Sequence, residues 1–209
     1  DFVDDAALCV DYLRNAGYDK VVVAGHSEGG MVALHLALRD NVAVDGIVLL
    51  SAAGYPMDTI LMRQLSAQLM PSYMGLMVSA TDIIQRLKRG EDVAEDRIPK
   101  ELMSLLHPSV QPCLRSYLTT DPGELIAKVE CPTLIISGGR DIQISVDNAE
   151  RLFSSSKGAK HISFADMSHV LKDATTDDRI EQMLSVYTNS QLPLTEGLAD
   201  AIVEFLKSL

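Results

Sequence analysis

The stretch VVVAGHSEGG, residues 21–30, restricts the fold of this chain more than any other. A β-branched apolar run ends at Gly25, Ser27 follows two residues later, and a helical pattern begins after Gly30. A G-x-S-x-G sequence between a strand and a helix predicts a sharp turn that exposes the serine hydroxyl at the head of the helix. We expect side chains at Gly25 or Gly29 to crowd this turn. The alternative is an ordinary glycine-rich turn with an incidental serine.

The flanking sequence supplies the expected strand and helix. Lys20–Ala24 is apolar on both faces, which is typical of a central parallel strand. A second apolar run at 44–51 follows the helix expected at 30–39, and a helix is expected at 2–15 before both. Strand, helix and strand in this order predict one βαβ unit with a right-handed crossover.

Residues 55–128 have a different pattern, with helices broken at prolines and Gly90 and no convincing strand. Six of the nine methionines lie here: Met57, Met62, Met70, Met74, Met77 and Met103. One interpretation is a helical insertion that packs on itself. The other is a lid whose flexible apolar face contacts substrate, and it makes four of them candidate substrate contacts: Met57, Met70, Met74 and Met77.

The sheet pattern returns after this insertion. Strands are expected at 132–137 and 160–164, helices at 146–154 and 198–206, and a polar segment at about 172–194. The prediction is an α/β fold with about four parallel strands, in which 1–54 and 129–209 form the core and 55–128 a helical lid.

Charge and cysteine content exclude several classes of protein. The 209 residues include 18 basic and 29 acidic side chains, and the net charge of −11 argues against nucleic acid or an anionic membrane as partner. No apolar run approaches the roughly 20 residues of a membrane span. The odd number of three cysteines suggests neither a disulfide framework nor a zinc site, and we expect no metal or cofactor. Cys9 and Cys131 are expected in the core, and a reducing, cytoplasmic location is favoured.

A serine nucleophile needs a base, which in a parallel α/β sheet belongs on a loop after a strand. Of the five histidines, His169 alone has this position, and we predict that it is the general base and acid. His26 lies inside the turn, where we expect it to pack or hydrogen-bond beneath Ser27. It is kept as a further candidate substrate contact. The other three are expected to be structural or surface residues: His35, His107 and His161.

The orienting carboxylate is predicted to be Asp141, which ends the strand at 132–137 in the turn GGRD. A turn or helix-capping role is the alternative for this aspartate. Asp147 is expected in the N-terminal turn of the following helix, and Asp166 is a loop alternative beside His169. With Asp141, the order along the chain is serine, acid, histidine, as the turn motif predicts.

These segments resemble an α/β-hydrolase of the serine-aminopeptidase-like and esterase/lysophospholipase-like branch. The resemblance is carried by GHSEGG, CPTLIISGGRD and MSHVLKD, within residues 19–173, and by the closing helix in QLPLTEGLADAIVEFL. It implies hydrolysis of carboxylic esters through an acyl-enzyme, with Ser27, Asp141 and His169 as the triad. Glu28 follows the serine, so the resemblance gives its main-chain N–H the role of one oxyanion-hole donor.

Family members have about four strands before the helix expected at 2–15, with a loop that supplies the second oxyanion donor. We therefore expect this chain to be a fragment, or the ordered or processed part of a longer hydrolase, with an open apolar strand edge at 20–24. The expected substrate is a small or medium acyl ester, and the oligomeric state is open. Peptidase, thioesterase or acyltransferase chemistry and a non-catalytic ligand-binding domain are the alternatives.

Overall fold

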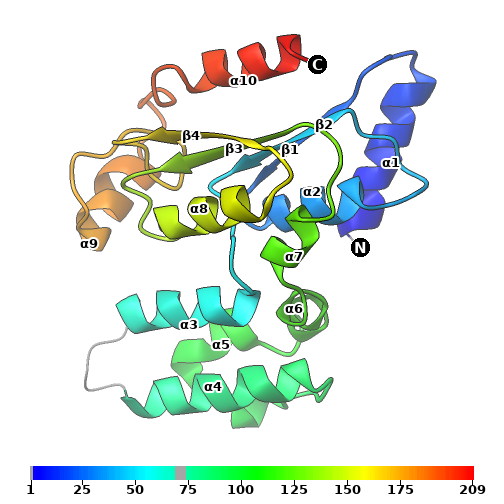
Figure 1. Ribbon diagram of the computed structural model, residues 1–209. Helices are drawn as coiled ribbons and strands as arrows, with labels where there is room; N and C mark the ends of the chain where they lie inside the picture. The colour runs from blue at the N-terminus through cyan, green and yellow to red at the C-terminus, as the bar shows by residue number, and fades with distance from the viewer. Residues whose placement is uncertain (1, 69–73) are drawn as a thin grey trace. The chain divides into compact units, whose positions relative to one another are not determined.

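Four strands form one parallel sheet in the order β1-β2-β3-β4, as the computed structural model shows for residues 2–68 and 74–209 (Figure 1). The strands are β1 (Val22–His26), β2 (Gly46–Leu50), β3 (Thr133–Gly138) and β4 (Lys160–Phe164). All neighbouring pairs are parallel, with Val22 opposite Gly46 and Leu134 opposite Lys160. The predicted α/β fold with four parallel strands is confirmed.

Helices cover both faces of this sheet (Figure 1). On one face, α10 (Leu198–Lys207) packs Phe205 against Val48 and Leu134. On the other face, α2 (Gly29–Ala37) and α8 (Val146–Ser155) bury Leu34 and Leu152. Alternate residues of β2 and β3 enter the two clusters, which accounts for the unbroken apolar runs that predicted these strands.

Strand β1 lies at the edge of the sheet, as expected for residues 20–24, although its apolar pattern is typical of a central strand. Among the described residues its hydrogen-bonded neighbour is β2 alone, and Ala24 and His26 are exposed. Helix α1 (Phe2–Asn15) buries Ala7 and Val10, but it leaves Cys9 exposed, so the prediction of a buried Cys9 is wrong. The spacing marked an apolar helix face that the structure covers only in part.

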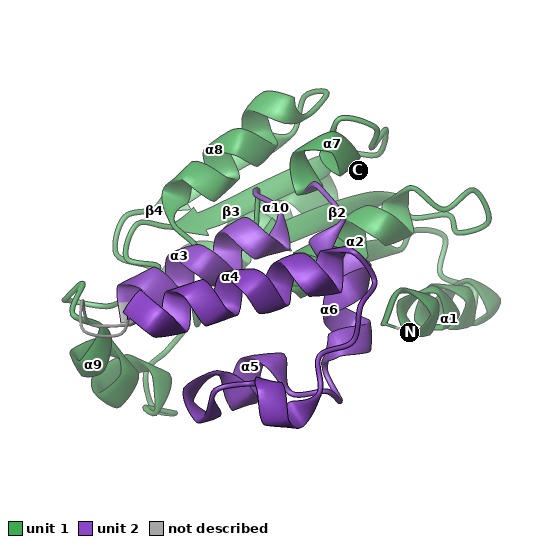
Figure 2. Ribbon diagram, turned by 90° about the horizontal axis from the view of Figure 1, so that it is seen from below, with its two compact units in different colours: residues 1–54, 122–209 green, residues 55–121 purple. Residues whose placement is uncertain are grey.

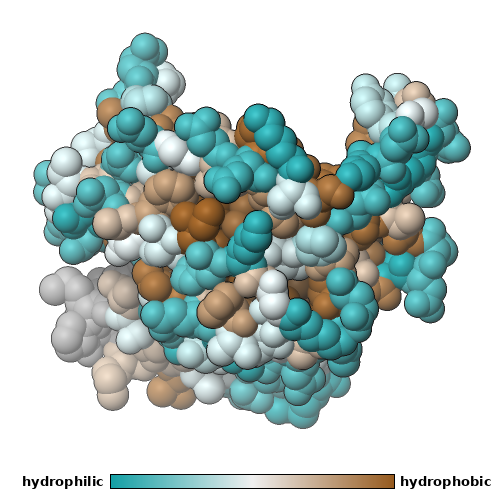
Figure 3. Space-filling view, turned by 45° about the horizontal axis from the view of Figure 1, so that its top comes forward, coloured by the Kyte–Doolittle hydropathy of each residue, from teal (hydrophilic) through white to brown (hydrophobic). Residues whose placement is uncertain are grey.

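Apolar side chains also remain at the surface near α10. Leu194, Val203 and Leu206 are exposed. Figure 3, in which the top of Figure 1 comes forward, shows brown apolar residues among teal hydrophilic ones.

The chain divides into a sheet unit, residues 1–54 and 122–209, and a helical unit, residues 55–121 (Figure 2). The sequence placed the end of the insertion at 128. The structure instead gives α7 (Pro122–Ile126) to the sheet unit, because Ile126 and Val129 join the core cluster of Leu34 and Ile135.

The helical unit has its own core. Its elements are α3 (Met57–Gln68), α4 (Met74–Lys88), the 3₁₀ turns η2 (Glu95–Arg97) and η3 (Lys100–Leu102), α5 (Met103–Leu106) and α6 (Gln111–Leu118). Leu65, Ile84, Leu106 and Leu118 are buried among one another. Gln111 of α6 links the loop around Val93 to this core, since its side chain hydrogen-bonds both the N–H and the carbonyl of Val93.

The polar segment at about 172–194 contains regular structure. Residues Arg179–Gln182 form α9, and Met183–Tyr187 form the π-helical turn η4. Asp178 begins α9, because its side chain accepts a hydrogen bond from the N–H of Glu181 at 2.8 Å.

Candidate active site

The turn after β1 holds Ser27 in a strained conformation. Its φ is 54°, in the left-handed region that residues other than glycine rarely adopt. Its N–H donates to the carbonyl of Leu50 at 2.9 Å, and its own carbonyl accepts from Gly30 N–H at 3.0 Å. The serine therefore lies at the junction of β1 and α2, as the motif predicted. Such strain gathers at functional sites.

The glycines of the turn differ in the space that is available for a side chain. A Cβ on Gly25 would lie 2.1 Å from the carbonyl oxygen of Gly29, and one on Gly30 would lie 2.4 Å from Ala52 Cβ. A Cβ on Gly29 would meet nothing within 4 Å. The prediction of crowding is correct for Gly25 and wrong for Gly29. The contact with Ala52 that restricts Gly30 comes from another strand end, which sequence spacing does not reveal.

His169 is buried on the loop after β4, with 5% of its surface exposed. The loop is held by Ser168, whose N–H and hydroxyl both donate to the carbonyl of Lys172, at 2.8 and 2.7 Å. A bridge between Met167 and Asp173 closes the loop at its base. The loop that carries His169, the predicted base, is therefore held by hydrogen bonds at its two ends.

Asp141 lies against this histidine. Its Oδ2 is 2.9 Å from His169 Nδ1, and its side chain is fully buried. Its Oδ1 accepts two main-chain hydrogen bonds, from Gln143 and Ile144, each at 2.8 Å. The other carboxylate candidates have different partners, since Asp147 bonds Ser145 and Asp166 pairs with Arg140.

The other imidazole nitrogen of His169 faces the serine. Nε2 lies 3.0 Å from Ser27 Oγ. In the neutral imidazole, Nδ1–H donates to Asp141 and Nε2 accepts from the Ser27 hydroxyl. The structure thus brings together three side chains from three strand ends, over 142 residues of sequence. This hydrogen-bond chain is the geometry that a serine nucleophile with a histidine base requires.

His26 makes a contact that the sequence did not assign. Its Nε2 is 2.7 Å from the main-chain oxygen of His169, and its ring centroid is 4.9 Å from that of His169. A carbonyl oxygen can only accept, so Nε2 carries the proton. His26 is one residue before Ser27 and contacts the loop of the base.

The candidate methionine contacts belong to the helical unit, where they have different surroundings. Met57 and Met77 are partly buried against the core cluster of that unit. Met74 is 72% exposed at the start of α4, and Met70 lies outside the described residues. Their contact with substrate stays a prediction.

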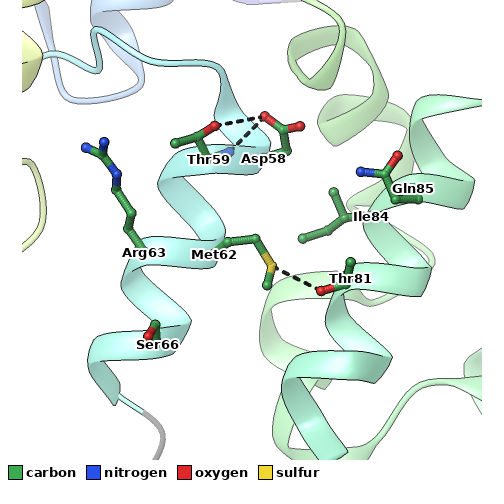
Figure 4. Close-up of a pocket in the computed structure, with 8 residues that line it drawn as sticks. All are labelled: Asp58, Thr59, Met62, Arg63, Ser66, Thr81, Ile84 and Gln85. Atoms are coloured by element: carbon green, nitrogen blue, oxygen red, sulfur yellow. Dashed lines mark hydrogen bonds between the residues drawn. The ribbon is translucent and has the colours of Figure 1, made fainter. Parts of the chain in front are cut away.

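A cavity of about 410 Å³ lies in the helical unit between α3 and α4 (Figure 4). Met62 and Ile84 form its apolar wall, and the Met62 sulfur lies 3.9 Å from the hydroxyl of Thr81. At one end Asp58 pairs with Lys88 at 2.5 Å, and the Arg63 guanidinium stacks over the Tyr55 ring at 4.2 Å. The charged groups of this cavity, Asp58 and Arg63, are thus engaged within the unit.

A second serine–histidine pair lies on the sheet. Ser137 Oγ is 2.9 Å from His161 Nε2, and the Phe153 ring packs on His161. Burial lowers the pKa of His161 below its ordinary value. Serine and histidine here satisfy each other inside the strands, so we assign them a structural role.

Metal ligands do not cluster in residues 2–68 and 74–209: no group of three histidine, cysteine or carboxylate side chains there could hold an ion. Nor does any helix in these ranges have the length and apolarity needed to cross a membrane.

Solved structures of other proteins have a similar fold. The esterase PF2001 of Pyrococcus furiosus superposes on 99% of this chain, over 61% of its own length, with a TM-score of 0.59 and 16% identity. A lipase-esterase related protein of Clostridium acetobutylicum covers 97% of the chain, over 73% of its own length, with a TM-score of 0.52 and 15% identity. These likenesses show the α/β-hydrolase fold.

Sequence comparison identifies the family to which the chain belongs. The profile of the serine aminopeptidase S33 family matches residues 1–172, and the chain belongs to this family of hydrolases. The esterase EstD of Thermotoga maritima is 25% identical over 173 residues, which is 81% of this chain. The chain spans 40% of the length of that relative. The predicted α/β-hydrolase membership is confirmed.

Proposed function

We propose that the protein is a serine hydrolase that cleaves carboxylic esters through an acyl-enzyme. The observation that carries the proposal is the hydrogen-bond chain from Ser27 Oγ to His169 Nε2 at 3.0 Å, and from His169 Nδ1 to Asp141 Oδ2 at 2.9 Å. EstD, the relative described above, is an esterase, which supports esters as the substrate class.

In the proposed reaction, the Ser27 oxygen attacks the ester carbonyl carbon while His169 Nε2 takes its proton. His169 then returns this proton to the departing alkoxide, which leaves as the alcohol, and the acyl group stays on Ser27. Water attacks the acyl-enzyme with the same histidine as base, and the free acid leaves. Asp141 keeps the imidazole in the required tautomer and stabilises its protonated form.

The negative charge on the carbonyl oxygen needs hydrogen-bond donors. We propose the main-chain N–H of Glu28 as one of them, because this residue follows the serine and precedes α2. The N-terminal end of α2 also favours negative charge at this place.

The test is covalent labelling of the intact protein with a fluorophosphonate, followed by peptide mass analysis. An adduct on Ser27, absent from Ser27→Ala, supports the nucleophile. No adduct on Ser27, or equal labelling of the variant, rejects it. Controls are Ser51→Ala, a buried serine at the end of β2, and heat-unfolded protein.

The name of the family favours a second candidate, peptide hydrolysis by the same three residues. A panel of p-nitrophenyl esters and aminoacyl-p-nitroanilides of matched size separates the two. Higher kcat/KM for the esters supports the first proposal, and higher kcat/KM for the anilides supports the second.

A further inference from the structure

The two residues that flank the Asp141 turn are held by one segment elsewhere in the chain. Gln182 Nε2 donates to the main-chain oxygen of Arg140 at 2.9 Å, one residue before the carboxylate. Gln143 Nε2 donates to the hydroxyl of Tyr187 at 3.1 Å, two residues after it. Both partners lie in residues 176–187, which we call the brace segment.

The brace segment is itself fixed. Asp178 caps its first helical turn, and the buried Gln182 also donates to the carbonyl of Thr176 at 2.7 Å. Asp177 pairs with the guanidinium of Arg140 at 3.1 Å. Val186 is buried, and the segment closes on a π-helical turn that ends at Tyr187. Single π turns in proteins frequently occur at functional sites.

These contacts matter because Asp141 is positioned by its own loop. Its Oδ1 is bound by the N–H groups of Gln143 and Ile144, so the direction of Oδ2 toward His169 follows the main chain at 140–144. A group held through its neighbours keeps its geometry only if those neighbours are fixed. The Gln143 side chain and the carbonyl of Arg140 are both fixed by the brace segment.

We propose that the brace segment positions the Asp141 carboxylate, with Tyr187 and Gln182 as positioning residues for the reaction. The inference rests on the proposed function, since it concerns the carboxylate of the same three-residue chain. Neither side chain is given a contact with substrate.

The hydroxyl of Tyr187 suits this role. Burial raises the pKa of this phenol, the Gln143 hydrogen bond lowers it, and the nearby Asp141 carboxylate raises it further. The Tyr187 hydroxyl therefore stays neutral at neutral pH. The charged groups nearby are Asp141 and Arg179, together with Arg140 and its partners Asp166 and Asp177.

The test uses Tyr187→Phe, Gln143→Met and the double variant. Each removes the hydrogen bond between Gln143 and Tyr187, by deleting the acceptor, the donor or both. Thr188→Val is the matched control, because it removes a neighbouring exposed hydroxyl that donates to the carbonyl of Leu184. Each intact protein is measured for its pseudo-first-order labelling of Ser27 by a fluorophosphonate across pH. The low-field NMR signal of His169 Nδ1–H and thermal unfolding are recorded as well.

Each single variant is expected to lower the labelling rate about 3- to 10-fold. The pH dependence of labelling is expected to differ from that of the wild type, because a loosened Asp141 orients the imidazole less well. The Nδ1–H signal should weaken or shift. The double variant should lose no more labelling rate than the more affected single variant, since all three lack the same Gln143–Tyr187 hydrogen bond. Thr188→Val should match the wild type.

The inference is overturned if wild-type protein labels at Ser27 while Tyr187→Phe and Gln143→Met keep its rate, pH profile and Nδ1–H signal. Losses that add in the double variant overturn it too. Should Tyr187→Phe fail to fold, Gln143→Met decides by the same readouts. Absence of labelling in the wild type is a different result, because it removes the proposed function and the inference with it.

Discussion

The imidazole of His26 donates from Nε2 to the main-chain oxygen of His169 at 2.7 Å. The bond joins the turn that carries Ser27 to the loop that carries the proposed base, across 143 residues of sequence. The bond holds the main chain of His169, and both ring nitrogens of His169 remain available to Ser27 and Asp141. We therefore infer that His26 aligns the base with the serine.

The first prediction concerns this bond. His26→Phe keeps a ring but no donor, so kcat for ester hydrolysis should fall about 3- to 10-fold, with a smaller change in KM. His26→Gln places an amide N–H near the position of Nε2 and should recover most of the activity. Steady-state kinetics and thermal unfolding check both. If the two variants lose equally, the hydrogen bond has no such role, and a loss confined to KM would indicate that His26 contacts substrate.

The second prediction separates the three carboxylates considered for the acid. Asp141→Asn should lower kcat by about 10⁴-fold, the magnitude typical of a serine hydrolase that loses its orienting aspartate. Asp147→Asn, in the first turn of α8, and Asp166→Asn, on the loop after β4, are matched controls. They should stay within about 10-fold of the wild type, because their partners are Ser145 and Arg140. Equal losses at Asp141 and either control would reject the assignment.

Much of the sheet unit could be predicted from the sequence. The strand at 160–164 and the helix at 146–154 agree with β4 and α8 to within one residue, because alternating apolar residues in a strand and an amphipathic helical pattern are local signals. The positions of Asp141 and His169 followed from one topological rule, that the ends of parallel strands meet at one edge. Their separation from Ser27 in sequence did not matter to that rule.

Other features depend on contacts between distant residues, which one sequence does not display. Gly30 is restricted by Ala52, and Cys9 is exposed because α1 is covered only in part. The brace segment reads as polar, yet Gln182 is fully buried through hydrogen bonds to two carbonyls. Burial of a polar side chain in this way leaves no apolar period to detect.

The third prediction compares two glycines of the turn. Gly25→Ala should destabilise the fold strongly and displace Ser27, because its Cβ would lie 2.1 Å from a main-chain oxygen that cannot move without moving α2. Gly29→Ala should fold normally, since its Cβ meets no atom within 4 Å, and alanine is the better helix former. Urea unfolding and labelling of Ser27 are the measurements. An unfolded Gly29→Ala with a stable Gly25→Ala would contradict the geometry of the turn.

The fourth prediction concerns the stability of the fold as a function of pH. Burial lowers the pKa of His161 below its ordinary 6.5, so between the two values the unfolded chain holds a proton that the folded chain lacks. The stability that the neutral His161–Ser137 pair contributes is thus fully present above pH 6.5 and decreases as the pH falls below it. The free energy of unfolding of wild type minus that of His161→Gln, from urea titrations, should decline on acidification. His35→Gln should show the same sign, since burial also lowers the pKa of His35. A difference that is constant or that rises toward acid pH would show that His161 is not held neutral in the fold.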